Sequence, residues 1–209
     1  MSLLAAYNVD EGVSDATVVD RAGNRNDFTL TNSGVTRAAG HTGYGLSNTG
    51  NANPAYPPNI GQTANRTVML WAKGPNTTPG WLIQWYVSTI DSGCWGILNI
   101  SGSIHIQARN ATTLARASTA RPADISTTWH HIAGTYDGAN VRLYLDGVLK
   151  ATSALTGPLR SDAVLQLYGY TESNVIDDIA IYDEVLDVTA IAAAAATPVG
   201  TDSGTYAFI

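Results

Sequence analysis

The sequence has 209 residues, of which 44% are hydrophobic and only 13% are charged, and its formal net charge is −6. A chain of this length can bury a sizeable core as a single all-β domain. The acidic balance excludes the basic footprint of a nucleic-acid-binding protein, and Cys94, the only cysteine, excludes an internal disulfide.

The first third of the chain consists of short strand-like segments between loops rich in Gly, Asn and Asp. Ala38 to Gln62 is predicted to be mostly loop, with one short strand near Gly45 to Ser47. A loop of that length is often a binding surface, although it can also wrap the edge of a sheet. The strands predicted before this loop are Leu3 to Asn8, Thr17 to Asp20, Phe28 to Leu30 and Gly34 to Arg37.

Longer strands are predicted in the middle of the chain. Side chains alternate along Arg66 to Lys73. One face is predicted to carry Val68, Leu70 and Ala72, and the other Thr67, Met69, Trp71 and Lys73. Ser101-Gly102 is predicted to reverse the chain between two strands. The further strands predicted here are Trp81 to Ile90, Gly93 to Ile100, Ser103 to Arg109 and Thr112 to Ser118, followed later by Val164 to Tyr170 and Val175 to Tyr182.

The clearest pattern lies in Trp129 to Thr152, which reads WHHIAGTYDGANVRLYLDGVLKAT. Asp-Gly occurs twice between runs of apolar residues, and this dipeptide is the strongest short-range signal for a β-hairpin. Three strands joined by two tight turns are therefore expected. Val141, Leu143 and Leu145 are expected to face the core, and Arg142 and Tyr144 to lie on a partly hydrated face.

Helical periodicity is confined to Val188 to Thr197, which is rich in alanine and ends before Pro198. Counting the segments gives about twelve strands and predicts an antiparallel two-sheet sandwich with a short C-terminal helix. We assign residues 1–197 to the sandwich and residues 198–209 to a tail. The tail ends in Tyr206, Phe208 and Ile209, which either fray or dock on a partner or on a second copy of the chain.

Several motifs of this chain recur in one known family. Trp-His-His, Gly-Thr-Tyr-Asp-Gly and Leu-Tyr-Leu-Asp-Gly follow one another after Thr128, and AAYNVDEG, VVDRAGNRND, LTNSGVT and IDDIAIYDEVLD occur outside that stretch. In this order they resemble the laminin G-like, concanavalin A-like lectin/glucanase domains, especially the variant found in bacterial and phage surface proteins. The resemblance spans roughly Leu3 to Ala196 and implies a jelly-roll topology, but such folds have many activities.

Hydrolytic members of this fold use carboxylates in an E-x-D-x-E pattern, because an acid and a nucleophile must flank one glycosidic bond. The chain has only three glutamates, Glu11, Glu172 and Glu184, and none has that spacing. His130 and His131 are consecutive on a predicted strand, so they face opposite ways and are expected to have structural roles. The sequence therefore predicts no catalytic residue, and a glycoside hydrolase is the least favoured function.

Calcium is the one cofactor that the chain suggests. The loop DRAGNRND offers carboxylate, amide and carbonyl oxygens within a few residues, and these are the ligands that Ca²⁺ prefers. In the related family an ion often joins the N-terminal loop to the closing strand, which implies Asp20, Asn26 and Asp177 as ligands. The alternative is that Asp20 and Asn26 form turns and that Asp177 accepts backbone hydrogen bonds.

Aromatic side chains are the candidates for ligand binding, because sugar rings stack on Trp and Tyr while their hydroxyls bind amides and carboxylates. A two-sheet core also needs several of these rings, so each of them has a competing core assignment. The candidate ligand-binding residues are Trp81, Trp85, Trp95, Tyr168, Tyr170 and Asn174.

These observations predict a non-enzymatic recognition or adhesion module that binds glycans or proteins at a surface. The alternative is a structural protein that decorates or cements a capsid or tail without binding glycan. Met1 leads into a strand-like segment without the features of a signal peptide, and no stretch approaches the about 18 apolar residues of a membrane span. The surface of a phage virion is therefore the expected location, with the protein made in the cytoplasm and released by lysis. The alternative is a cytoplasmic protein, or one whose leader has been removed.

Overall fold

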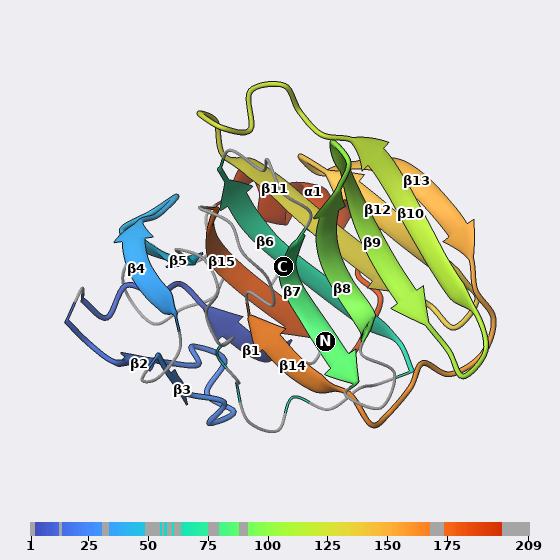
Figure 1. The fold of residues 1–209 in the computed structure, drawn as a ribbon, viewed down its shortest axis with the longest axis horizontal. Helices are drawn as coiled ribbons and strands as arrows, with labels where there is room; N and C mark the ends of the chain where they lie inside the picture. Colours follow the sequence, from blue (N-terminus) through green and yellow to red (C-terminus); the bar gives the residue numbers. More distant parts are fainter. Residues whose placement is uncertain are drawn as a thin grey trace.

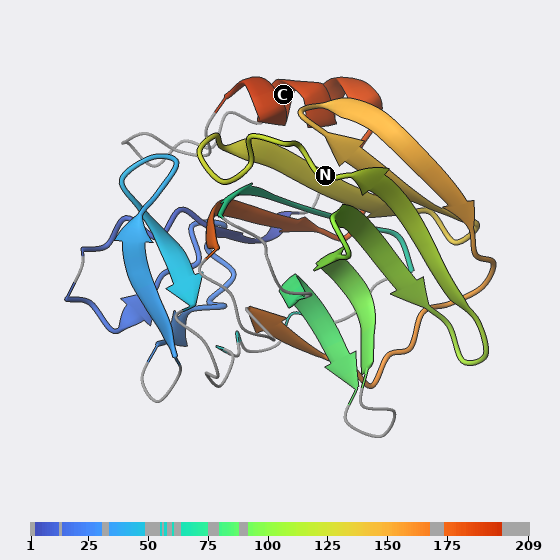
Figure 2. The ribbon, with the colours of Figure 1, turned by 45° about the horizontal axis from the view of Figure 1, so that its top comes forward.

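The computed structural model describes residues 3–12, 14–30, 34–48, 55, 57, 60, 64–74, 80–87, 92–167 and 174–197. These residues form fifteen strands and one helix. Figure 1 and Figure 2 show two facing sheets, with the helix packed on the far side of one of them. The predicted all-β sandwich with a C-terminal helix is confirmed, with more strands than the sequence suggested. Among the described residues, no helix has the length and hydropathy needed to cross a membrane.

The larger sheet is antiparallel and brings the first and last strands of the chain side by side. Its strands are β1 (Leu3–Tyr7), β4 (Val35–Ala39), β5 (Tyr44–Asn48), β6 (Arg66–Lys73), β11 (His130–Tyr136), β12 (Asn140–Leu145), β13 (Val148–Ala154) and β15 (Val175–Tyr182). Their order is β13-β12-β11-β6-β15-β5-β4, and β1 also pairs with β15. We call it the eight-stranded sheet.

The smaller sheet is also antiparallel and consists of five strands. They are β7 (Gly80–Val87), β8 (Ser92–Ile100), β9 (Ser103–Arg109), β10 (Leu114–Ala120) and β14 (Val164–Leu167), in the order β10-β9-β8-β7-β14. Two short strands, β2 (Thr17–Val18) and β3 (Phe28–Thr29), pair separately near the N-terminus.

Tight turns form where the sequence predicts them. Asp146 and Gly147 have φ values of 52° and 76°, and Ser101 and Gly102 have 51° and 79°. Positive φ at both central residues is typical of a type I′ turn, whose twist matches that of the paired strands. The other Asp-Gly reversal is longer, and Asp137 Oδ1 accepts the amides that follow it. The hairpins of the Trp129 to Thr152 stretch are thus confirmed.

The core lies between the two sheets and follows strand alternation. Val141, Leu143 and Leu145 belong to it, with exposed fractions of 0%, 0% and 7%. The sheets approach closely at Gly134 of β11, where a Cβ would lie 2.4 Å from Ile106 Cδ1 of β9. Glycine is therefore required at this position, because a larger residue would push the facing isoleucine aside.

The helix α1 (Val188–Ala196) packs on the outer face of the eight-stranded sheet (Figure 2). Asp187 caps it by accepting the amide of Ala190 at 2.8 Å. Ile191 of the helix is fully buried in a second apolar cluster with Met69, Ala133, Tyr144, Ala180 and Leu186. The predicted partly hydrated position of Tyr144 is wrong: this side chain is 5% exposed because α1 lies in the same cluster.

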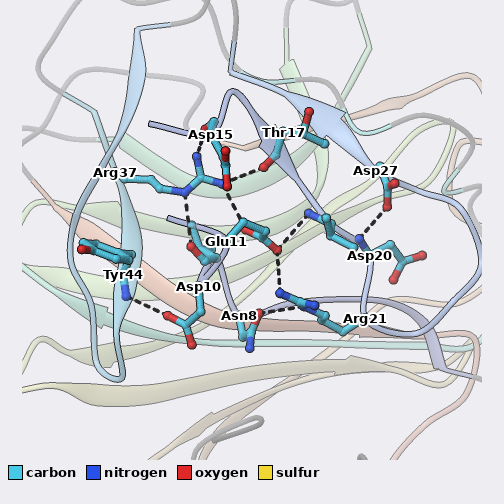
Figure 3. A network of polar contacts seen from close by, with 12 residues as sticks. Asn8, Asp10, Glu11, Asp15, Thr17, Asp20, Arg21, Asp27, Arg37 and Tyr44 are labelled. Atoms are coloured by element: carbon cyan, nitrogen blue, oxygen red, sulfur yellow. Dashed lines mark hydrogen bonds and ion pairs between the residues drawn. The ribbon is translucent and has the colours of Figure 1, made fainter. Parts of the chain in front are cut away.

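A polar network fixes the N-terminal loops to the eight-stranded sheet (Figure 3). Arg37 of β4 pairs with Glu11 at 3.0 Å, and the two side chains are only 2% and 10% exposed. The same guanidinium donates to the carbonyl oxygens of Val9, Asp15 and Thr17. Glu11 also accepts from Arg21 at 3.1 Å. Since every partner of Arg37 lies in residues 9–17, this one side chain holds the N-terminal loop in place.

Candidate ligand-binding site

Three strands of the smaller sheet place a glutamine between two core residues. The triplets are Ile83-Gln84-Trp85 in β7, Ile106-Gln107-Ala108 in β9 and Leu165-Gln166-Leu167 in β14, and the flanking residues of all three lie in the core. Successive side chains of a strand point to opposite faces. The three glutamines therefore point away from the core, onto the outer face of the five-stranded sheet.

The strand register brings these glutamines into one line. Gln166 pairs with Gln84, Gln84 with Gly96, Gly96 with Gln107, and Gln107 with Arg116. Gln84 Nε2 donates to Gln166 Oε1 at 2.7 Å, and Arg116 Nε donates to Gln107 Oε1 at 2.8 Å. We call these five residues the glutamine row, which crosses the whole sheet from β14 to β10.

The central position of the row is a glycine. Gly96 has a φ of 145°, and a Cβ there would lie 2.1 Å from the carbonyl oxygen of Ile83, so only glycine fits. Gln84 and Gln107 face each other across this glycine and are both 1% exposed. Gln84 Oε1 is buried and has no hydrogen-bond partner among the described residues. The centre of the row therefore holds an amide oxygen that is ready to accept a hydrogen bond.

Two aromatic residues flank the row on the same face. Tyr86 lies two positions beyond Gln84 on β7, and Trp81 pairs with Leu98, two positions beyond Gly96 on β8. Both rings are partly exposed, unlike the tryptophans of the core. Trp81 points outward because the register shifts between it and Ile83. The face thus combines amides at its centre with aromatic rings on either side.

The other polar cluster lies on the outer face of the eight-stranded sheet. Asp177 Oδ2 accepts the amides of His41 and Thr42 at 2.8 and 3.2 Å, and Oδ1 accepts the amide of Asp178 at 2.8 Å. Burial raises the pKa of Asp177 to about 7, although these amide donors act in the opposite direction and the nearby Asp10 adds to the rise. Asp177 therefore anchors the turn between β4 and β5.

Aromatic contacts complete this anchor. The His41 ring stacks on Trp71 with the ring centroids 3.9 Å apart, and its Nδ1 lies 3.1 Å from Asp178 Oδ2. His131 meets the edge of Trp71 at 5.5 Å, and burial lowers the pKa of its imidazole to about 4. His130, on the opposite face, binds Asp124 and Asp146 through its two nitrogens. The structural roles predicted for His130 and His131 are confirmed.

The three predicted calcium ligands have other partners. Asp20 Oδ1 accepts the amides of Ala6 and Ala22, and its Oδ2 accepts the backbone and side-chain nitrogens of Asn26. Both oxygens of Asp177 are likewise occupied by amides. Among the described residues, no three His, Cys, Asp or Glu side chains gather as a metal site. This arrangement does not fit an ion, and calcium stays a prediction from the family resemblance.

The sequence and the fold can be compared with known proteins. The family model of the concanavalin A-like lectin/glucanases superfamily matches residues 42–192, which is most of the chain. The chain belongs to this superfamily. The predicted family resemblance is thereby confirmed. No curated protein sequence matches the chain.

Two of the solved structures with a similar fold are binding domains of bacterial proteins. The binding domain of Paraclostridial Mosquitocidal Protein 1 aligns with a TM-score of 0.73 at 16% identity, covering 92% of this chain and 51% of the other. The receptor-binding domain of botulinum neurotoxin type G gives 0.71 at 14% identity, covering 94% and 51%. This member of the superfamily therefore spans about half the length of the toxin domains that it matches.

One smaller neighbour matches over nearly its whole length. Domain 4 of AbnA, an extracellular arabinanase from Geobacillus stearothermophilus solved with arabinotriose, aligns with a TM-score of 0.70 at 19% identity. The alignment covers 93% of this chain and 98% of that domain. At such low identities, these likenesses establish the fold of the superfamily member alone.

The predicted ligand-binding tryptophans divide between the two faces of the smaller sheet. Trp81 lies beside the glutamine row, whereas Trp85 and Trp95 are 2% and 0% exposed and pair across β7 and β8 on the core face. Their assignment to a ligand is wrong, because each ring fills the interior. Trp85 Nε1 donates to the carbonyl of Ile60, and Arg66 lies over the Trp95 ring.

Asn174 does not join the glutamine row. It precedes β15 of the other sheet, is 6% exposed, and lies so close to Gly74 that a Cβ there would be 2.2 Å from its Oδ1. It therefore lies apart from Trp81, and its predicted ligand contact stays a prediction. Tyr168, Tyr170 and the tail residues Tyr206, Phe208 and Ile209 lie outside the described residues.

Sequence analysis missed Gln84, Gln166 and Arg116. The signal was a single glutamine in the middle of an apolar strand, repeated in three strands. An uncharged polar residue between two core residues points to the opposite face of the sheet. The repetition could have identified one polar face, but the register that aligns the three glutamines comes only from the structure.

Proposed function

We propose that the protein is a non-enzymatic recognition module that binds glycans on the outer face of its five-stranded sheet. The observation that carries this proposal is the glutamine row with Trp81 and Tyr86 on either side. Sugar rings present apolar faces that stack on aromatic side chains, while their hydroxyls donate to and accept from amides. The outer face supplies both kinds of group within a few residues.

The composition of this face also favours glycan binding over glycoside hydrolysis. The strands β7, β8, β9, β10 and β14 contain no Asp or Glu. Glycoside hydrolysis ordinarily needs two carboxyl groups about 5 to 9 Å apart on either side of the scissile bond. A glycan held across the glutamine row would meet amides and one guanidinium there, so recognition without cleavage is the function that the face supports.

The neighbours are consistent with this proposal. The domain of the arabinanase was solved with arabinotriose, and the botulinum neurotoxin type C neighbour is described as depending on two ganglioside molecules for cell entry. Another neurotoxin neighbour is in complex with a protein, rat synaptotagmin II. The alignment covers only 51% of each neurotoxin domain, so the arabinanase domain, matched over 98% of its length, supports a glycan more directly.

Location is a separate part of the proposal. We propose that the module acts on the surface of a phage virion, where it would meet glycans of a host cell. Mass spectrometry of particles purified from lysates of the source strain tests this location. Recovery of the protein only from the soluble cell fraction would contradict the location and leave glycan binding untouched.

The glycan proposal is tested with Trp81→Ala. We expect the wild-type protein to bind a subset of an array of immobilised bacterial and plant oligosaccharides, and the variant to bind the same subset at least about tenfold more weakly. Its melting temperature should change little, because Trp81 is partly exposed and outside the core cluster.

The matched control is Leu149→Ala, which removes a 45% exposed apolar side chain from β13 of the other sheet. This variant should bind as the wild type does. A wild-type protein that binds no glycan on the array would contradict the proposal and favour the alternative of a decoration protein.

A further inference from the structure

The most informative atom of the glutamine row is Gln84 Oε1. It is buried on a face that points away from the core, and no described residue donates a hydrogen bond to it. A buried acceptor without a partner costs about 1–3 kcal/mol, so such atoms are rare in folded proteins. Gly96 of β8, which pairs with Gln84, has no side chain that could donate to this oxygen, and a Cβ there would lie 2.1 Å from the carbonyl oxygen of Ile83.

We propose, on the basis of the glycan-binding function above, that the centre of the glutamine row is a subsite for a neutral sugar unit, whose hydroxyl donates to Gln84 Oε1 above Gly96. The amide nitrogen of Gln84 is already used, because it donates to Gln166 Oε1 at 2.7 Å. The oxygen is therefore the atom that Gln84 offers to a ligand.

A hydroxyl fits this subsite better than a carboxylate in either orientation of the Gln84 side-chain amide. An ionised carboxylate only accepts hydrogen bonds, so it cannot satisfy an amide oxygen. If the Gln84 and Gln166 amides were both turned over, the free atom would be a nitrogen, and a hydroxyl would accept from it equally well. Only a group that both donates and accepts suits either orientation.

Charge on this face is confined to one side of the row. Arg116 lies at its β10 end and already donates to Gln107 Oε1, and Arg109 lies on β9 two positions beyond Gln107. Gln84 and Gln166 occupy the other end, and no side chain of β7 or β14 is charged. A carboxylate placed beside Gln84 would therefore lose its hydration without gaining a cation from these two strands.

The subsite is tested by isothermal titration with neutral trisaccharides (arabinotriose, xylotriose and cellotriose) and with trigalacturonate, in which every unit has a carboxylate. We expect the wild-type protein to bind at least one neutral trisaccharide and to bind trigalacturonate at least tenfold more weakly. Binding of trigalacturonate as tightly as the best neutral probe would overturn the subsite and leave glycan binding intact. Absence of binding to all four, together with a blank array, would overturn the proposed function itself.

Two substitutions of Gln84 then test whether affinity depends on its hydrogen-bond acceptor or on the shape of its side chain. Gln84→Met keeps the length of the side chain and removes the acceptor, so the affinity for the neutral probe should fall about tenfold. Gln84→Glu keeps an oxygen acceptor but loses the donor to Gln166 Oε1, so in the neutral form of its carboxyl it should retain more affinity than Gln84→Met. Lys150→Met, an exposed change on β13, serves as the control and should not alter binding.

Melting temperatures of the Gln84 variants show whether each is folded. A folded Gln84→Met variant that binds like the wild type would overturn the proposal. If Gln84→Glu alone is unfolded at pH 7, its affinity is measured at pH 5, where a buried carboxyl is more readily neutral. Loss of affinity in folded Gln84→Glu with retention in Gln84→Met would show that shape, and not an acceptor, governs the subsite.

Discussion

Asp177 and Gln84 lie on the two opposite outer faces of the sandwich and differ in how the chain satisfies their polar atoms. On the eight-stranded sheet, Asp177 is fully buried and the three amides that it accepts come from its own chain. On the five-stranded sheet, Gln84 is equally buried, but its oxygen has no partner among the described residues. Burial alone therefore does not mark a ligand site in this fold. The informative property is whether the chain satisfies its own polar atoms.

The comparison predicts that polar residues of the eight-stranded sheet control stability and that those of the five-stranded face control binding. The largest effect is expected from Arg37→Met, which leaves the buried Glu11 with only the more exposed Arg21 as a cation. Removing one partner of a buried ion pair costs about 3–5 kcal/mol. For a chain of this size, that lowers the melting temperature by about 6–20 °C. Thermal unfolding followed by circular dichroism measures the loss.

A second substitution shows whether the buried charge is the cause. Glu11→Gln in the Arg37→Met background removes a buried carboxylate that then has only Arg21 as a cation, and should recover part of the lost stability. Equal melting temperatures of the single and double variants would contradict a buried-charge explanation. Glycan affinity, measured well below the melting temperature, should be unchanged in both, since Arg37 lies in the other sheet.

A smaller effect is expected on the pH dependence of stability, to which Asp177 and His131 contribute with opposite signs. The pKa of Asp177 is raised to about 7 by burial, above the unfolded value near 4. Its contribution to stability is therefore present at low pH and is lost as pH rises through about 7. Asp177→Asn removes this dependence, so its stability relative to the wild type should increase by at least about 1 kcal/mol between pH 4 and 8.

The titration of His131 changes stability with pH in the opposite direction to that of Asp177. Burial lowers its pKa to about 4, below the unfolded value near 6.5, so its contribution is present above pH 6.5 and is lost as pH falls through about 4. His131→Gln should therefore gain stability relative to the wild type as pH falls over that range. Denaturant unfolding from pH 4 to 8 distinguishes the two variants, and parallel curves for both would contradict the assigned titrations.

The smallest effect is expected from calcium. The oxygens of Asp20 and Asp177 already accept amide hydrogens, so we expect melting temperatures in millimolar CaCl₂ and in EDTA to agree within about 1 °C. A calcium-dependent rise that Asp177→Asn abolishes would instead establish the site implied by the family resemblance. Either result shows whether the carboxylate oxygens of Asp20 and Asp177 need a bound ion in addition to their hydrogen bonds within the chain.

Much of the fold could be predicted from local patterns. The alternation in Val141 to Leu145, the Asp-Gly reversals and the alanine-rich segment after Asp187 all correspond to observed elements. These features depend on neighbouring residues, which a sequence displays directly. Tyr144 was assigned to a partly hydrated face because the element that covers it, α1, is more than forty residues away along the chain.

The face taken by each tryptophan could not be predicted. Simple alternation places Trp81 and Trp85 on the same side of β7, since they are four residues apart. The register shift between Trp81 and Ile83 turns Trp81 outward, whereas Trp85 faces the core opposite Trp95. A bulge is set by strand pairing rather than by local sequence. The anchor between His41 and Asp177 likewise joins residues 136 positions apart.

The positions of β1 and α1 determine how the protein can be tethered. β1 lies within the eight-stranded sheet, and α1 covers that sheet from outside, so the first and last described elements belong to the same half of the sandwich (Figure 2). A domain joined directly to Leu3 or to Ala196 would therefore be attached to the half of the sandwich that does not carry the glutamine row.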